Sequence, residues 1–183
     1  LDPSDTPEPT NDDPDNPQDI DKDKEPDTND VINTIDDNTS ACEPSTAEAA
    51  LLLAHNEARS QARICGETTY APAVALSWNC TLEASSLKHS QDMAELNFFS
   101  HTGSNGLSPF DRITNAGYQY RYAGENIAAG QRSVEEVVAG WLDSPGHCKN
   151  IMSPNFTEMG GARVNTDSAD YASYWTVNLG QPF

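Results

Sequence analysis

The sequence predicts a layered α+β domain over residues 45–183, preceded by an acidic segment over residues 1–44. Two observations carry the fold class. Helical patterns dominate from residue 45 to about residue 145, and strand patterns follow only in the C-terminal part. Because helices and strands do not alternate, a parallel sheet of βαβ units is excluded and a layered α+β domain is expected.

The first 44 residues differ sharply from the rest in composition. They hold 15 of the 29 acidic residues, two of the ten basic residues, seven of the 12 prolines and no aromatic residue. Such a segment cannot bury enough apolar surface to offset its ordering entropy, so we expect a disordered acidic, Pro- and Asp-rich tail. Residues 45–183 have a length that suits one compact domain.

Charge and hydropathy narrow the classes of partner. The formal net charge of −19 excludes nucleic acid as a partner, because proteins bind it mostly through contacts of Lys and Arg with the phosphates. No apolar run is long enough to cross a bilayer, so no transmembrane segment is expected. The chain opens with Leu1-Asp2-Pro3, as an exported protein would after removal of its signal peptide. We therefore expect a secreted or envelope-associated protein, and a monomer.

Four helices are predicted from capping residues and from apolar periodicity. Ser, Thr, Asn or Asp at a helix start satisfies free backbone N–H groups, and Pro is tolerated in the first turn. Val134, Val137, Val138 and Trp141 also follow the i, i+3, i+4, i+7 spacing of a half-buried helix. The expected helices are 46–64, opened by a Ser45/Glu48 capping box and ended by Gly66; 80–96, capped by Asn79; 109–117, opened by Ser108-Pro109; and one that begins with a Ser133/Glu136 capping box and stops at Pro145-Gly146.

Two strands are predicted in the C-terminal part, over 159–165 and 174–180. The second alternates apolar and polar positions through Trp175, Val177 and Leu179. The segment 118–128 is expected to be extended or loop-like.

Three polar residues are the strongest candidates for a functional site. His101, Glu125 and His147 each lie in a Gly-, Ser- or Pro-rich segment beside strongly apolar sequence. Loops held by a rigid core often carry function, and His is the commonest metal ligand and titrates near neutrality. His147 follows the predicted helix stop, where the helix dipole favours its cationic form. By contrast, His89 is expected to be a packed core histidine and His55 to be structural or on the surface.

The four cysteines indicate two disulfides in an oxidising compartment, because their number is even and no CxxC pair occurs. Three connectivities are possible. We favour Cys65–Cys80, which closes a short loop, together with Cys42–Cys148. The arrangement Cys65–Cys148 with Cys42–Cys80 remains open.

Seven segments resemble, in order along the chain, the CAP superfamily of cysteine-rich secretory, antigen 5 and pathogenesis-related proteins, and are most similar to its bacterial secreted branch. The resemblance implies a three-layer α-β-α sandwich with a small antiparallel sheet between helices, and an extracellular protein. The segments are HNEAR, LSWN, HSQDMAELNFFSHTG, AGENIAAG, GWLDSPGHCKNIM, FTEMGGARV and YWTVNLG, between His55 and Gly180.

The resemblance also implies a cleft with two His and two Glu. By motif, the two His are His101 and His147 and the first Glu is Glu125. The position of the second Glu is Ser144, preceded by Asp143, so the set is incomplete and Asp143 is the nearest substitute. Asn126 is a further candidate for the cleft. Zinc or another divalent cation is the cofactor that such a cleft suggests.

Two functions are weighed. The first is a non-catalytic binding module whose cleft holds a divalent metal, an apolar ligand such as a lipid or sterol, or a protein or cell-wall partner; the resemblance implies roles of this kind. The second is a metal-assisted extracellular hydrolase of peptides or wall polymers, with Glu125 as base. The binding module is favoured, because no nucleophile with a base and an orienting third group is evident.

Overall fold

The computed structural model describes residues 43–183. The predicted acidic tail, apart from its last two residues, and Cys42 lie outside the described residues. Within 43–183 the chain forms a four-stranded sheet in the order β3-β5-β6-β4, plus a separate hairpin of β1 and β2. The strands are β1 Arg63–Cys65, β2 Thr68–Tyr70, β3 Ser77–Trp78, β4 Tyr120–Ala129, β5 Glu158–Asn165 and β6 Ser173–Pro182.

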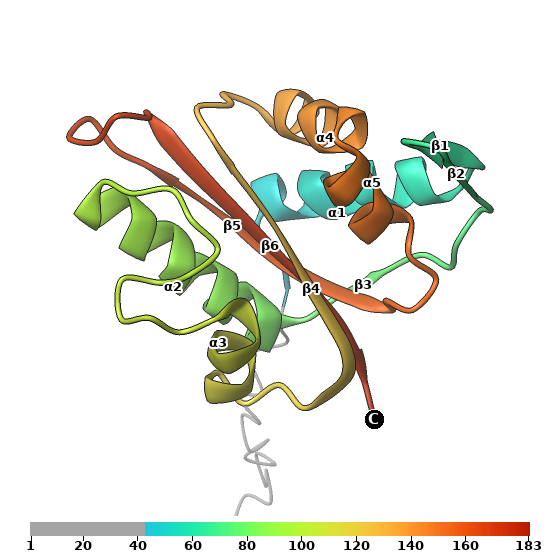
Figure 1. The fold of residues 1–183 in the computed structure, drawn as a ribbon, viewed down its shortest axis with the longest axis horizontal. Coiled ribbons are helices and arrows are strands. Elements are labelled where there is room, and N and C mark those ends of the chain that lie inside the picture. The colour runs from blue at the N-terminus through green and yellow to red at the C-terminus, as the bar shows by residue number, and fades with distance from the viewer. Residues whose placement is uncertain (1–42) are drawn as a thin grey trace, which may run out of the picture. The chain divides into compact units, whose positions relative to one another are not determined.

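Helices cover both faces of this sheet, which gives the expected α+β sandwich (Figure 1). The sheet is antiparallel except where the two-residue strand β3 pairs in parallel with β5. The helices are α2 Cys80–Leu96 and α3 Pro109–Asn115 on the first face, and α1 Thr46–Arg59, α4 Val134–Asp143 and α5 Pro145–Met152 on the second.

The predicted caps are largely confirmed. Ser45 and Ser108 form complete capping boxes, and the Asn79 side chain accepts from two N–H groups of α2. Ser133 caps α4, but the Glu136 carboxylate accepts from the Arg132 N–H instead of returning to Ser133.

The first helix is shorter than predicted. It ends at Arg59, and Gly66 lies in the turn of the β1–β2 hairpin with φ of +63° instead of ending a helix. Arg59 is fully buried, and its guanidinium donates to four backbone carbonyls, of Val74, Ile151, Ser153 and Phe156. A buried cation must have its N–H donors bonded, and one of the carbonyls, that of Val74, comes from the segment that follows α1. That segment therefore turns back toward Arg59, which ends the helix.

Pro145-Gly146 does not lead into a loop as predicted. Pro145 occupies the first turn of α5, where its missing N–H costs nothing, so one helix ends and the next begins at once. His147 therefore lies in the first turn of a helix. The predicted favouring of its cationic form by a helix C-terminus is wrong, because the N-terminal end of a helix carries partial positive charge.

Glu125 is also not on a loop, because it lies in the middle of β4. Residues 124–128 are all buried. A strand that is buried on both faces lacks the alternation of apolar and polar residues by which a strand is predicted from sequence. The two C-terminal strands were predicted within one or two residues of their observed ends.

The favoured disulfide pairing is wrong. Cys65 bonds to Cys148, with their Cα atoms 5.5 Å apart, so neither Cys65–Cys80 nor Cys42–Cys148 forms. The alternative that was left open contains this bond. Cys65 ends β1 and Cys148 lies on α5, which contact each other although 83 residues separate them in sequence. Cys80 is disulfide-bonded as well.

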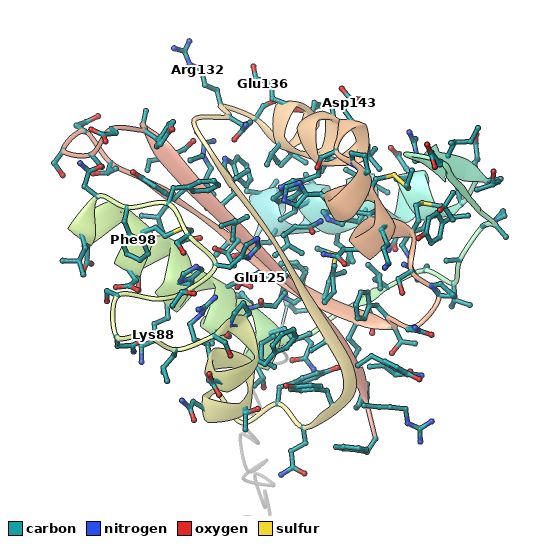
Figure 2. All side chains as sticks on the ribbon, viewed as in Figure 1. Lys88, Phe98, Glu125, Arg132, Glu136 and Asp143 are labelled. Atoms are coloured by element: carbon teal, nitrogen blue, oxygen red, sulfur yellow. A yellow bond between two sulfur atoms is a disulfide. The ribbon has the colours of Figure 1, made fainter. Side chains whose placement is uncertain are left out.

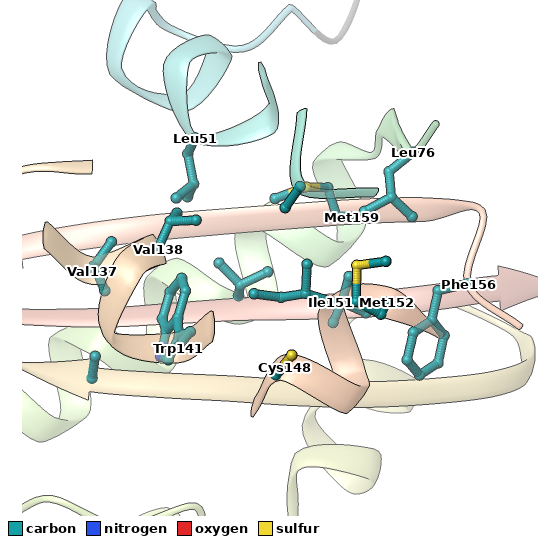
Figure 3. Packing of buried hydrophobic residues seen from close by; sticks show 14 of the residues in the cluster. Leu51, Leu76, Val137, Val138, Trp141, Cys148, Ile151, Met152, Phe156 and Met159 are labelled. Atoms are coloured by element: carbon teal, nitrogen blue, oxygen red, sulfur yellow. The ribbon is translucent and has the colours of Figure 1, made fainter. Parts of the chain in front are cut away.

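The larger hydrophobic core lies between the sheet and the helices α1, α4 and α5 (Figure 3). It is built around Trp141, Ile151 and Met159, all at most 2 % exposed. A smaller core on the opposite face joins Met93 of α2 to Ile127 of β4. Since β4 is at the end of the strand order, it is an edge strand that contributes side chains to both cores.

Candidate functional site

The candidate residues meet at the edge strand β4, where successive side chains point to opposite faces of the sheet. Glu125 faces the α2–α3 side, and its carboxylate meets groups from α3 and from the preceding loop (Figure 2). Asn126 faces the other side, where its amide donates to the His147 carbonyl and accepts from Asn150, both on α5. The strand thus connects the two layers of helices at this edge.

His101 lies in the loop between α2 and α3 and is bonded to Glu125. Its Nδ1 lies 2.8 Å from Glu125 Oε1, with the His101 side chain 50 % exposed and the Glu125 side chain 2 % exposed. Since a carboxylate only accepts, Nδ1 carries the proton, and Nε2 is the ring nitrogen left for other contacts. Glu125 therefore orients the His101 ring.

The other Glu125 oxygen is held by Arg112, a residue that the sequence analysis missed. Arg112 Nη2 donates to Glu125 Oε2 at 2.6 Å, and Nη1 donates to the carbonyls of His101 at 2.8 Å and Leu107 at 3.0 Å. One guanidinium thus fixes both the carboxylate and the loop that carries His101. The available signal was that Arg112 is the only Lys or Arg between residues 89 and 120.

His147 is half-buried in the first turn of α5. Burial, and secondarily the charge of the nearby His101 ring, lower the pKa of His147. Its Nδ1 is buried and has no hydrogen-bond partner among the described residues. Because the charge of His101 contributes to this shift, the two rings lie within electrostatic range of each other. That they share one site stays a prediction.

A pocket of about 270 Å³ lies beside His147. Its wall is mostly apolar, and its polar members are Gln131, Ser144 and His147. Residues from β4, α4 and two loops contribute the apolar part of the wall, namely Phe99, Ile127, Ala128, Ala129, Val137, Gly140, Trp141 and Tyr171. The pocket can take an apolar group and offers it polar contacts from Gln131, Ser144 and His147.

The residues at this edge do not fit a catalytic zinc centre. Such a centre uses three protein ligands and a water. Both Glu125 oxygens are already engaged, which leaves the imidazoles of His101 and His147. Asp143 is exposed and does not line the pocket, whereas Ser144 does. Among residues 43–183, no group of three His, Cys, Asp or Glu side chains is placed to hold a metal ion.

The remaining histidines do not line the pocket beside His147. His89 is buried as predicted, and its Nε2 lies 2.9 Å from the Ser100 carbonyl. His55 is buried under α4, with Nδ1 bonded to the Leu51 carbonyl and its ring edge-on to Trp141. Burial lowers the pKa of His55 to about 4.

Comparisons with known proteins agree with the fold. Residues 52–179 match the Cysteine-rich secretory protein family (CAP). The chain is 48% identical over 88 residues to the uncharacterized protein YkwD of Bacillus subtilis and 35% identical over 104 residues to its uncharacterized membrane protein YlbC. These alignments cover 48% and 57% of this chain but only 34% and 28% of the relatives, so the chain matches about a third of their length.

Solved structures with this fold include an extracellular SCP-domain protein from Bacillus anthracis. It is 30% identical, with a TM-score of 0.53 over 60% of this chain and 34% of that chain. An outer surface protein of Borrelia burgdorferi is 25% identical, with a TM-score of 0.55 over 61% of this chain and 80% of its own. A structure of NaASP2 with Zn2+, at 14% identity and a TM-score of 0.50 over 76% and 84% of the two chains, shares the fold.

Proposed function

The chain belongs to the cysteine-rich secretory protein (CAP) family, and on that premise we propose that it is an extracellular binding module. The Cys65–Cys148 disulfide supports a location outside the cytosol, because such bonds persist in oxidising compartments. No helix within residues 43–183 has the length and apolar character needed to cross a membrane. The ligand is expected at the edge of β4, in the pocket beside His147.

The observation that carries this proposal is the chemistry of the pocket wall. Aromatic and aliphatic side chains dominate it, and His147, whose buried Nδ1 has no hydrogen-bond partner among the described residues, is one of its polar members. Small-ligand sites are typically apolar with a few placed polar groups. We therefore expect a ligand with an apolar body, such as an acyl chain or sterol, and one polar group that meets the imidazole.

A metal-assisted hydrolase is disfavoured by the state of Glu125. A general base must be accessible to water, and this carboxylate is buried, with one oxygen bonded to His101 and the other to Arg112. A divalent cation at this edge would be held by the two imidazoles and solvent alone, so we expect weak binding. No step of the proposed function depends on a metal.

The test measures thermal stability with lauric acid, cholesterol hemisuccinate and zinc chloride as separate probes. We expect one of the apolar probes to raise Tm, and the His101→Ala/His147→Ala variant to lose that rise. A Thr102→Ala/Lys149→Ala variant is the matched control, since it changes exposed neighbours of each histidine. A response that is equal in both variants contradicts the proposed site.

Turnover is measured in parallel on peptide, ester and peptidoglycan substrates, with zinc supplied. Hydrolysis that Glu125→Gln abolishes and a chelator inhibits would replace the binding module with the hydrolase. Zinc alone is expected to raise Tm slightly and only at high concentration, because two imidazoles fall short of the three protein ligands of a catalytic site.

A further inference from the structure

A second cavity, of about 500 Å³, lies between α2 and α3. It is lined from α2 by Lys88, His89 and Glu95 and from α3 by Arg112, among others, and none of its lining residues lines the pocket beside His147. Its volume falls within the range of small-molecule sites. Unlike that pocket, it has several charged side chains in its wall.

The wall holds two acidic and two basic side chains, and one of each sign makes no ion pair or hydrogen bond among the described residues. Asp92 is engaged by the N–H and Oγ of Ser104, and Arg112 by Glu125. Lys88 and Glu95 make no hydrogen bond or ion pair among the described residues (Figure 2 marks Lys88). They are seven residues apart on α2, two turns along one face, so their backbones lie about 10 Å apart.

Two residues of the same wall each carry a buried nitrogen that has no hydrogen-bond partner among the residues that the structure describes. The nitrogens are His89 Nδ1 and Arg112 Nε, on residues that both line the cavity. His89 Nε2 faces the Ser100 carbonyl and so carries the proton, which leaves Nδ1 as an acceptor. Burial lowers the pKa of His89, so the ring stays neutral and keeps this acceptor. Arg112 Nε is a donor.

We propose that this cavity binds a short peptide with a free ammonium and a free carboxylate end. The free charges at Glu95 and Lys88 match the two ends, and an extended chain of three residues spans about 10 Å. A peptide unit carries one N–H and one carbonyl, which match the unpaired acceptor and donor of the wall. Both nitrogens are shielded from solvent, so a small shift of the wall accompanies their contact with the ligand.

Arg112 connects this cavity to the Glu125–His101 pair. The same guanidinium whose Nε is unpaired holds Glu125 and the His101 carbonyl with its terminal nitrogens. A peptide that accepts a hydrogen bond from Arg112 Nε therefore shifts the guanidinium that holds Glu125 and the His101 carbonyl. Occupation of the cavity is expected to change the NMR signals of the His101 ring without any contact between ligand and ring.

The experiment is an NMR titration of the full chain with tri-alanine, following the Arg112 Nε–H and His89 ring signals. We expect saturable shifts at both, and a smaller shift at His101. Lys88→Gln and Glu95→Gln should each weaken binding by about fivefold, as expected for one solvent-accessible ion pair. N-acetylated, C-amidated tri-alanine has neither charged end. Its affinity should therefore be lower by about the product of these two fivefold effects.

Controls separate this site from the pocket beside His147. Lys149→Gln and Glu57→Gln remove the same charges from exposed positions outside the cavity and should leave binding unchanged. The His101→Ala/His147→Ala variant should also bind tri-alanine normally. The result of this titration is therefore independent of whether the pocket beside His147 binds an apolar ligand. The proposal is overturned by absence of shifts at about 20 mM tri-alanine, or by equal affinity for free and blocked peptide.

Discussion

Replacing Arg112 by Met should destabilise the protein far more than loss of an ordinary surface charge. Arg112 and Glu125 have side chains that are 9 % and 2 % exposed, and their charged groups lie 2.6 Å apart. Removing one member of a buried ion pair leaves the other charge uncompensated and costs about 3–5 kcal/mol. The variant also releases the His101 and Leu107 carbonyls that Arg112 binds.

The assay is urea unfolding followed by tryptophan fluorescence. Arg121→Met is the matched control, because Arg121 is exposed on the same strand as Glu125, and it should change the free energy of unfolding by less than about 0.5 kcal/mol. Adding Glu125→Gln to Arg112→Met removes the stranded charge, so the double variant should be more stable than Arg112→Met alone. A loss below about 1 kcal/mol for Arg112→Met, or strict additivity in the cycle, refutes the claim that this pair is buried and coupled.

Three further predictions concern stability. Removing the Cys65–Cys148 bond by Ser at both positions should lower the free energy of unfolding by up to about 4.5 kcal/mol, because the bond closes a loop of 83 residues; an unchanged urea midpoint would contradict this. Since the folded pKa of His55 is about 4, below its ordinary 6.5, the unfolded chain binds more protons between these values. The contribution of His55 to the free energy of unfolding is therefore fully present above pH 6.5 and falls by about 3 kcal/mol toward pH 4. Urea unfolding across that range should show this dependence on pH, and His55→Gln should reduce it. Gly160→Ala should prevent folding as judged by circular dichroism, because a Cβ there lies 2.6 Å from the backbone oxygen of Asn79, whereas Gly140→Ala meets nothing within 4 Å and should raise Tm.

Helix starts could be predicted from sequence because their causes are local. Ser45, Asn79 and Ser108 cap the nearest following N–H groups, and each is found doing so. The early end of α1 could not be predicted in the same way. It follows from Arg59, whose guanidinium binds carbonyls up to 97 residues away, and no local pattern indicates such partners.

The same distinction holds at the candidate site. His101 and Glu125 were found because polar residues stood out in apolar surroundings, and the structure joins them at 2.8 Å. Arg112 was missed because an arginine is unremarkable on a short amphipathic helix until its partners are known. The assignment of Glu125 as a metal ligand or base stays a prediction, which the burial of its carboxylate and its ion pair with Arg112 disfavour.

The central claim is that folding brings the His101 and His147 rings to one site at the edge of β4. Burial and the His101 charge together lower the pKa of His147, so an NMR titration of His147 tests the claim directly. We predict a pKa below the ordinary 6.5 in the native protein and a rise toward that value in His101→Ala, because repulsion between two imidazolium rings is removed. A His147 titration curve that His101→Ala leaves unchanged would show that the two rings do not share a site.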